Sequence, residues 1–388
     1  MTGRVLPPVL GPVSASALWD AAVALLKGTV DAAALDDALA RAFPGRSVLL
    51  TDSGTNALAQ TFRRNAGGTG RTPVPIVALP AWCCPDIGTA AIAAAHRVVL
   101  YDLDPQTLLP DLESVERCLR AGAGALVLTH FFGRITDPAL VASMAAQYGA
   151  VVIEDAAQGA GGALAGQPAG TLTNWGVLSF GRGKGRNAGG GGALLSTDPL
   201  TETGQIAEGR VHNAKALAAT VATVLLGRPH IYGLLASLPF LRLGDTAYKA
   251  PSADHGPSMV TCALLPSVLA ASEEAATRRR QIASRWREAL LDLNGGLVRT
   301  VGADSVDGAL RFPVLISSAA AADLRPHGVV RSYPRTLSNY PEIAMAMVHS
   351  KDTFPGAELL AARLHTLPTH RFVRPDDLER VRRRLQRP

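Results

Sequence analysis

The sequence contains little cysteine, few aromatic residues and no recognisable signal peptide. Its four cysteines lack the spacing of a metal site, and the adjacent first two are not expected to pair: Cys83, Cys84, Cys118 and Cys262. We therefore expect no metal and a location in the reducing cytoplasm. No internal repeat is recognisable, which argues against a repeat architecture.

No apolar run is long enough to cross a membrane as a helix. The longest, Ala216–Leu226, is interrupted by Gly227-Arg228-Pro229-His230 and resumes over Ile231–Leu241. Each half falls short of the roughly 20 residues that a spanning helix needs. We predict a hydrophobic insert near 214–243 that forms a buried or lid-like helical hairpin. The alternative is a hydrophobic surface that touches a lipid-linked substrate or a partner subunit.

The formal net charge of +6 does not indicate nucleic-acid binding. Much of the excess lies in two helical clusters, Arg278–Arg280 and Arg380–Arg384, where basic residues are typical of a solvated face or a helix end. No aromatic-studded basic patch accompanies them. We expect small-molecule substrates and no nucleic-acid partner.

Short apolar runs alternate with helical patterns over the first half of the chain, which predicts an α/β sheet with helices on both faces. The candidate strands are 47–51, 76–79, 97–102, 125–130, 151–155, 176–180 and 193–196. Helical patterns lie between them at 55–65, 85–95, 112–121 and 138–148, after two short helices at 14–27 and 31–42. We expect a large domain with a mostly parallel, seven-stranded sheet.

A smaller carboxyl-terminal α/β domain is expected to follow. A long helical pattern over 260–291 carries Pro266 near its first turns and links the two domains. After it come a candidate strand at 310–316, a helix at 357–364 and a last helix that begins at Pro375-Asp376-Asp377. The expected boundary separates a large domain, 1–258, from a linking helix and small domain, 259–388.

Two apolar runs end in residues that carry chemistry. Asp155 directly follows the run Val151–Glu154. A later run ends in Ser179, five residues before Lys184. This order suits pyridoxal 5'-phosphate (PLP). A carboxylate pairs with its ring nitrogen, a hydroxyl binds its phosphate and an amine forms a Schiff base. The alternatives are that Asp155 merely caps a turn and that Lys184 lies on a glycine-rich surface loop.

A third segment, Asp52–Asn56, follows a candidate strand and opens a helix. Backbone amides at a helix amino terminus bind phosphate well, so this turn is a candidate for the phosphate of PLP. A plain helix N-cap by Ser53 or Thr55 is the alternative, and the two interpretations are compatible. The run Gly189–Gly192 permits close approach and unusual dihedrals, but alone it indicates no function.

Six segments of the chain are similar to motifs of one enzyme family. They are Ser53–Leu58, Leu79–Trp82, Thr129–Gly133, Asp155–Gln158, Ser179–Lys184 and Leu367–His370. The family they resemble is the DegT/StrS group of fold-type I PLP enzymes, best known as sugar-nucleotide aminotransferases. The likeness covers most of the chain. Its specific part is the set Asp155, Gln158, Ser179 and Lys184.

The resemblance implies roles for the cofactor residues. Asp155 would pair with the ring nitrogen and Gln158 with the 3' oxygen of PLP. Lys184 would form the Schiff base and then act as general base and acid. The phosphate would be held by Ser179 and by the turn residues Gly54, Thr55 and Asn56.

The resemblance also implies a fold-type I homodimer with sites at the interface. The expected function is transfer of an amino group from an amino acid, with glutamate as the expected donor. The expected acceptor is a keto-sugar nucleotide or related carbonyl metabolite in polysaccharide or secondary-metabolite biosynthesis. Two alternatives are left open. One is another PLP reaction in natural-product assembly, such as carbon–carbon bond formation, elimination or replacement. The other is a regulatory or scaffold protein, against which the complete cofactor set argues.

The chain departs from the family pattern at the wall above the cofactor ring. Cys84 stands where an aromatic ring usually stacks, and Trp82 is a candidate substitute. Cys84 is either a small apolar wall or a catalytic thiol. The family's Asn/Arg-bearing loop, which reaches the neighbouring subunit's phosphate, is also unrecognisable. The chain has His255-Gly256-Pro257-Ser258-Met259 there.

Three residues are candidates for substrate contacts. His130, at a strand end, either faces the substrate or is structural. Arg182 is a candidate for added positive charge at the site, and Arg331 for a clamp on a carboxylate or diphosphate.

Overall fold

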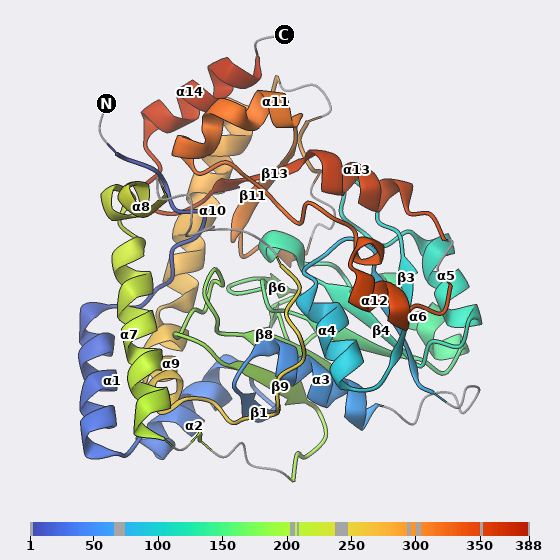
Figure 1. The fold of residues 1–388 in the computed structure, drawn as a ribbon, viewed down its shortest axis with the longest axis horizontal. Helices are drawn as coiled ribbons and strands as arrows, with labels where there is room; N and C mark the ends of the chain where they lie inside the picture. The colour runs from blue at the N-terminus through green and yellow to red at the C-terminus, as the bar shows by residue number, and fades with distance from the viewer. Residues whose placement is uncertain are drawn as a thin grey trace.

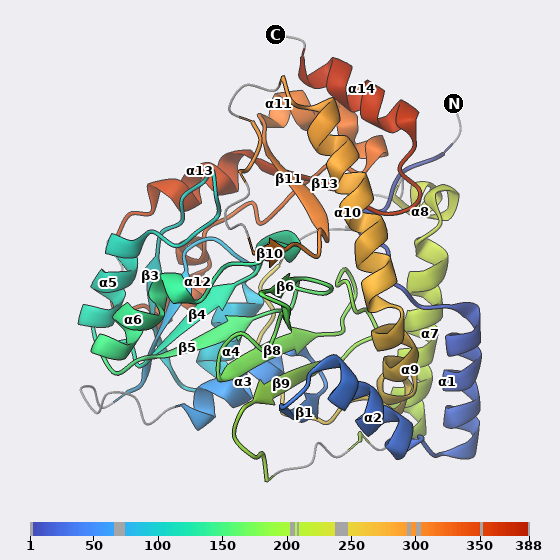
Figure 2. The ribbon, with the colours of Figure 1, turned by 180° about the vertical axis from the view of Figure 1, so that it is seen from behind.

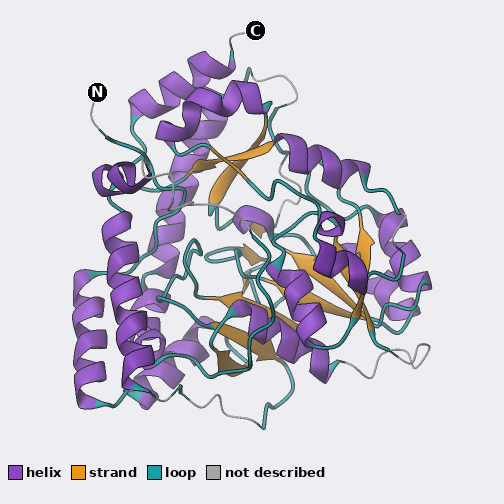
Figure 3. Cartoon of the chain, in the orientation of Figure 1, coloured by secondary structure: helices purple, strands orange, loops and turns teal. Residues whose placement is uncertain are grey.

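The computed structural model describes residues 3–65, 74–201, 206–207, 209–236, 247–292, 296–299, 304–349 and 352–386. Its centre is a seven-stranded sheet with helices on both sides, beside a small three-stranded sheet (Figures 1 and 3). This arrangement confirms the predicted α/β class and the mostly parallel main sheet.

The large sheet has the strand order β1-β9-β8-β5-β4-β2-β3. β9 runs antiparallel to both neighbours, and the other strands share one direction. The strands are β1 (Ser47–Thr51), β2 (Ile76–Pro80), β3 (Arg97–Tyr101), β4 (Ala125–Thr129), β5 (Val151–Asp155), β8 (Trp175–Ser179) and β9 (Gly192–Ser196). Their bounds lie within one residue of the predicted runs, because continuous apolar runs suit strands covered on both faces.

Helices cover both faces of the large sheet (Figures 1 and 2). α3 packs on α4, and α5 packs on α6. Their bounds are α3 (Gly54–Arg64), α4 (Asp86–Ala93), α5 (Leu112–Arg120) and α6 (Ala139–Gln147). The side chains of Ser53 and Asp111 cap α3 and α5 by accepting backbone N–H groups. The capping of α3 directly after β1 fixes its amino terminus at the carboxyl edge of the sheet.

The predicted long helix over 260–291 is in fact two helices, α9 (Met259–Ala270) and α10 (Ser272–Ala289), bent by 59°. α9 is apolar nearly all round and packs on α1 (Ala15–Lys27) and α2 (Ala32–Ala42), whereas α10 turns its apolar side to the small sheet. The bend follows from these two different packing partners. Within the described residues no single helix is long and apolar enough to cross a membrane. The bent pair α9 and α10 together has the length and composition of a membrane-crossing segment.

The small sheet has the antiparallel order β11-β13-β12. Its strands are β11 (Arg311–Leu315), β12 (Val330–Arg331) and β13 (Leu364–Pro368), with α13 (Pro355–Arg363) and α14 (Pro375–Leu385) beside them. A second three-stranded sheet consists of β10 (Ser305–Val306), β6 (Ala163–Leu164) and β7 (Gln167–Pro168), and two short helices are α11 (Ser318–Ala321) and α12 (Pro341–Ala346). The domain boundary at 258/259 stays a prediction, and α9 shares its core with the large sheet.

The hydrophobic insert starts with α7 (Arg210–Leu226) and α8 (Pro229–Ala236). α7 packs on α1, α8 and α9 and leaves Leu225 on the surface. The part of the predicted hairpin from residue 237 onwards lies outside the described residues. The insert is therefore helical at its start, with one face packed on the large domain.

Residues near the amino terminus contact the region around the small sheet. Leu6 N–H donates to the carbonyl of Pro326 (3.0 Å), and Arg4 forms an ion pair with Asp377 (2.8 Å) at the start of α14. Asp377 is buried and also accepts from His327 (2.8 Å). Although burial alone would raise the pKa of Asp377, the hydrogen bonds from His327 and Arg4 hold it well below its usual range.

The variant Asp377→Asn is expected to lower the free energy of unfolding by about 2–3 kcal/mol at pH 7, because it leaves Arg4 without its charged partner. A carboxyl whose pKa is depressed by folding stabilises the native state above its unfolded pKa. It loses that contribution as the pH falls below about 4. Urea denaturation should therefore show a difference between variant and native protein at pH 7 that shrinks in acid. Asp376→Asn, in the same turn but exposed, is the control, and equal losses at both pH values would contradict the assignment.

Candidate active site

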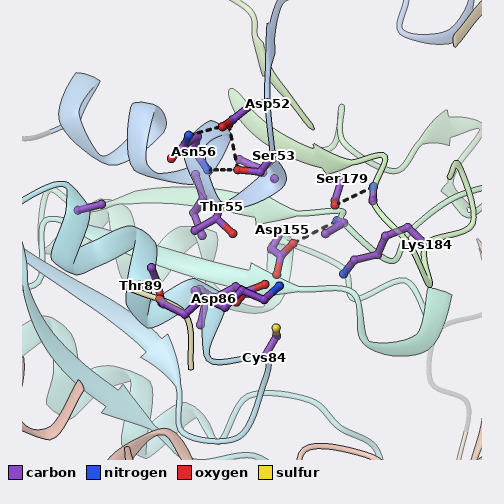
Figure 4. Close-up of a pocket in the computed structure, with 18 of the residues that line it drawn as sticks. Asp52, Ser53, Thr55, Asn56, Cys84, Asp86, Thr89, Asp155, Ser179 and Lys184 are labelled. Carbon is purple, nitrogen blue, oxygen red and sulfur yellow. Dashed lines mark hydrogen bonds between the residues drawn. The ribbon is translucent and has the colours of Figure 1, made fainter. Parts of the chain in front are cut away.

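A pocket of about 530 Å³ lies at the carboxyl ends of the central strands, where open α/β sheets place their ligands (Figure 4). Thr129, Asp155 and Ser179 reach it from the ends of β4, β5 and β8. The start of α3, residues 83–89, the loop after β8 and residues 249–252 supply the other walls. Its size is typical of small-molecule sites, which span about 300–1,000 Å³.

Asp155 ends β5 with its carboxylate between two donors. Its Oδ2 accepts from Thr129 Oγ1 (3.3 Å), and its Oδ1 accepts from Ala157 N–H (3.1 Å). Each carboxylate oxygen has two lone pairs, so both can accept a further hydrogen bond. The arrangement suits a partner that carries a proton on a ring nitrogen.

The first turn of α3 and Ser179 form another wall of the pocket. Ser53 Oγ accepts from Asn56 N–H (3.1 Å), while Asn56 Nδ2 donates to Asp52 Oδ1 (2.6 Å). Burial raises the pKa of Asp52 above its ordinary value, although the hydrogen bonds from Asn56 and Ser53 oppose the shift. The remaining amides of this turn and the hydroxyl of Ser179 are suited to an anion such as phosphate.

Gly54 and Ser179 lie so close that a Cβ on Gly54 would be 2.8 Å from Ser179 Cβ. Gly54→Ala is expected to displace Ser179 and to weaken PLP retention about 10-fold or more, because a hydrogen bond to a charged phosphate is lost. Equilibrium dialysis of PLP measures this. In the control Gly181→Ala the nearest atom to the new methyl group is Ser179 Oγ at 3.6 Å, an ordinary contact. Unchanged PLP affinity in Gly54→Ala would contradict the phosphate assignment.

Lys184 enters the pocket from the loop after β8, with its amino group directed toward Asp155 (Figure 4). The loop is closed by Ala188 N–H, which donates to the carbonyl of Phe180 (2.9 Å). Buried Arg186 anchors it with a guanidinium 5.1 Å from the ring centroid of Phe43. Burial lowers the pKa of Arg186 to about 10. The lysine therefore lies on a fixed loop.

The glycine run that follows is a packing requirement. Gly189 and Gly191 have positive φ values of 84° and 87°. A Cβ on Gly189 would lie 2.1 Å from Thr220 Oγ1 of α7, and one on Gly191 would lie 2.8 Å from Thr261 Cγ2 of α9. Side chains here would push the lysine loop away from both helices.

Gln158 lines the pocket with its amide held at both ends. Its Oε1 accepts from Phe132 N–H (3.0 Å), and its Nε2 donates to the hydroxyl of Tyr333 (2.6 Å). An amide NH2 group has two hydrogens, so a second donor remains for a ligand atom. Tyr333 itself lines the pocket and has an unusual positive φ of 41°.

The two candidates for the wall above the cofactor have different positions. Trp82 is fully buried, outside the pocket lining, and donates from Nε1 to the carbonyl of Tyr333 (2.8 Å). Cys84 lines the pocket, and burial raises the pKa of its thiol to about 12, with the charge of Asp86 adding to the shift. Its sulfur is protonated at neutral pH, which favours the wall over the catalytic thiol.

His130 is fully buried beside Glu154 and does not line the pocket. Its Nδ1 accepts from Thr136 N–H (3.2 Å), so its proton lies on Nε2, which donates to Glu154 Oε1 (2.7 Å). Glu154 also accepts from Gly170 N–H (2.5 Å). The hydrogen-bonded pair stabilises the end of β5 next to Asp155. Of the two roles considered for His130, substrate contact and structural support, this position fits the structural one.

The structure brings only one of the two candidate arginines to the pocket. Arg182 lines it. Arg331 does not, because its Nε and Nη2 atoms both donate to the carbonyl of Ala361 in the small domain (2.9 and 2.6 Å). Among the lining residues that sequence reasoning missed are Asp86, Lys249 and Tyr333. No motif signals them, since each reaches the pocket only through the fold.

The fold and the site are those of an enzyme of the aminotransferase class, with a carboxylate, an amine and a helix amino terminus around one pocket. The chain belongs to the DegT/DnrJ/EryC1/StrS aminotransferase family, whose family model matches residues 26–223. The resemblance noted in the sequence is thereby confirmed.

Three known proteins illustrate the relationship. A dTDP-4-dehydro-2,3,6-trideoxy-D-glucose 4-aminotransferase of Saccharopolyspora spinosa is 26% identical over 86% of this chain and 81% of its own. An L-glutamine:2-deoxy-scyllo-inosose aminotransferase of Streptomyces kanamyceticus is 32% identical, but over only 29% of this chain and 28% of its own. An E. coli GDP-4-keto-6-deoxy-D-mannose-3-dehydratase, solved with bound hydrated PLP, shares the fold at a TM-score of 0.72 and 13% identity, with 100% of each chain covered.

Proposed function

We propose that the protein is a PLP-dependent aminotransferase that moves an amino group from an amino acid to a keto-sugar nucleotide or a related cyclic ketone. One observation carries the cofactor assignment. Asp155, Ser179 and Lys184 line a single pocket together with the amino terminus of α3, which lies more than a hundred residues earlier in the chain. The family provides the reaction class.

PLP, when bound, supplies a protonated ring that accepts electrons from the bond broken at the amino acid. Asp155 would hold the proton on the ring nitrogen through its ionised carboxylate. The turn of Gly54, Thr55 and Asn56, with Ser179, would hold the phosphate. Gln158 would donate its second amide hydrogen to the 3' oxygen.

Lys184 would attach the cofactor and then carry the proton during transfer. Its Nζ is directed toward Asp155 within the pocket, so it can remove a proton from the donor carbon and return one to the neighbouring atom (Figure 4). Cys84 and Tyr333 would form the wall that limits water around this step.

The substrate proposal rests on the relatives. The Saccharopolyspora protein is named for a nucleotide-linked keto-sugar, and the Streptomyces protein for a cyclic ketone with L-glutamine as donor. Both acceptors are carbonyls on polyhydroxylated rings. We therefore include glutamine beside glutamate as a donor to be tested.

A homodimer in the cytoplasm completes the proposal. Two features support it. α1 leaves Trp19 and Leu26 exposed, with 71% and 87% of their surface open, which is unusual for a free surface. The four cysteines are unpaired. Light scattering of the purified protein tests the dimer directly.

Isotope transfer tests the reaction. The PLP-loaded enzyme is incubated with amino-labelled ¹⁵N glutamate or glutamine and either a dTDP-4-keto-sugar or 2-deoxy-scyllo-inosose. Mass spectrometry should find one ¹⁵N in the sugar or cyclitol product. Label that enters the cofactor but no ring ketone would contradict the acceptor class alone, and label that never leaves the donor would contradict the aminotransferase proposal.

A further inference from the structure

The hydroxyl of Tyr333 lies in the pocket beside the side-chain amide of Gln158. Gln158 Oε1 accepts from Phe132 N–H (3.0 Å), and this bond fixes which end of the amide faces which neighbour. Its Nε2 atom can only donate, so the Tyr333 oxygen, 2.6 Å away, is the acceptor. The hydrogen of the Tyr333 hydroxyl is therefore not used in this contact.

That hydrogen is available to a bound molecule. Within the described parts of the chain, Gln158 is the only hydrogen-bond partner of the Tyr333 hydroxyl. Burial raises the pKa of Tyr333 well above its ordinary value. The phenol thus keeps its proton at neutral pH and acts as a hydrogen-bond donor toward the pocket that it lines.

The backbone and the ring of Tyr333 are both held in this position. Its carbonyl accepts from Trp82 Nε1 (2.8 Å), and its φ of 41° lies in the left-handed region that residues other than glycine rarely adopt. Its ring packs edge-on against Trp82 and stacks on Phe132, with centroids 5.2 and 6.4 Å apart. Backbone strain of this kind persists where the surrounding structure enforces it, and it clusters at functional sites. Trp82, which lies outside the pocket lining, therefore positions Tyr333.

Two donors thus lie side by side on one wall of the pocket. The second amide hydrogen of Gln158 and the hydroxyl hydrogen of Tyr333 belong to heavy atoms 2.6 Å apart, so both can reach a single acceptor oxygen. Hydrogen bonds to an ionised acceptor are stronger than those between neutral groups. The pair is therefore suited to an oxygen that carries negative charge.

We propose that Tyr333 is a second hydrogen-bond donor to the 3' oxygen of PLP, beside Gln158. The inference rests on the proposed function and adds to it a cofactor contact from the carboxyl-terminal part of the chain. Two donors would share the negative charge of that oxygen, which Gln158 alone would meet with one hydrogen bond.

A cofactor analogue without the 3' oxygen tests the contact directly. Equilibrium dialysis measures how tightly the native protein and Tyr333→Phe bind PLP and 3-deoxypyridoxal 5'-phosphate, which lacks this oxygen. The variant should bind PLP about 10-fold more weakly, because one hydrogen bond to a charged oxygen is lost, and should bind the analogue within about 2-fold of the native value. A hydroxyl with a merely structural role would weaken the binding of both ligands equally.

The pH dependence of the visible band of lysine-bound PLP gives a second readout. The linkage between PLP and Lys184 loses its proton as the pH rises, and the 3' oxygen then carries its full negative charge. A donor to that oxygen favours the unprotonated form, so Tyr333→Phe should raise the pH midpoint of the spectral change by about one unit. A change in protein stability alone would not move this midpoint.

Tyr340→Phe is the matched control, because it also removes one phenolic hydroxyl from the same segment of the chain. Tyr340 is buried outside the pocket lining, and its hydroxyl has no hydrogen-bond partner among the described residues. This variant should match the native protein in both measurements. The proposal is overturned if Tyr333→Phe binds PLP normally, loses affinity for PLP and the analogue alike, or leaves the midpoint unchanged. Absence of the band from the native protein would instead contradict the proposed function itself.

Discussion

Replacing Lys184 by alanine is expected to reduce transamination by at least about 10³-fold, because both the attachment of the cofactor and the group that moves the proton are lost. The variant should also lose the visible band of lysine-bound PLP, although Asp155 and the α3 turn still bind the free cofactor. Rates with saturating donor and acceptor, together with the absorption spectrum, measure the two effects.

Lys215→Ala provides the control, since that lysine is exposed on α7. It should keep both the band and the rate. A Lys184→Ala protein with native activity would contradict the catalytic assignment. The scaffold alternative would be favoured if the native protein turned over no donor and if Lys184→Ala changed no function of the protein.

Asp155→Ala is expected to lower the rate of amino transfer by about 10³-fold, the scale on which a positioned electrostatic group acts. The cause is loss of the carboxylate that keeps a proton on the ring nitrogen, without which the ring is a poor acceptor of electrons. PLP should still attach to Lys184, so the visible band should persist while single-turnover rates with the donor fall.

Thr129→Val gives a graded comparison, because it removes only the hydroxyl that donates to Asp155 (3.3 Å). Its effect should be about 10-fold, in line with one hydrogen bond to a charged group. If Asp155→Ala slowed the reaction no more than Thr129→Val, the ring nitrogen would have another partner in the pocket.

Much of the fold and the cofactor pocket is predictable from the sequence, for a physical reason. The strands are continuous apolar runs, and their carboxyl ends meet at one edge of a parallel sheet. Asp155 and Ser179 follow directly from such runs, and Ser53 marks the helix start that places the α3 amides beside them. Local patterns therefore suffice for these residues.

Residues that reach the pocket through long-range packing are not predictable in this way. Tyr333 follows β12, far along the chain, and only the tertiary structure sets its hydroxyl against Gln158. His130 contacts Glu154 and not the pocket, because successive side chains of a strand point to opposite faces of the sheet. The bend between α9 and α10 arises from two different packing partners, which no local pattern reveals.

The most direct test of the central claim is the visible absorption spectrum of the PLP-loaded protein before and after addition of L-glutamate or L-glutamine. We predict a band of lysine-bound PLP that declines on addition of a donor, with the released cofactor recovered in its amino form by mass spectrometry. If the band persists with both amino acids, the PLP assignment stands, but neither glutamate nor glutamine is the amino donor. Absence of the band in a protein with intact Lys184 would contradict the account as a whole.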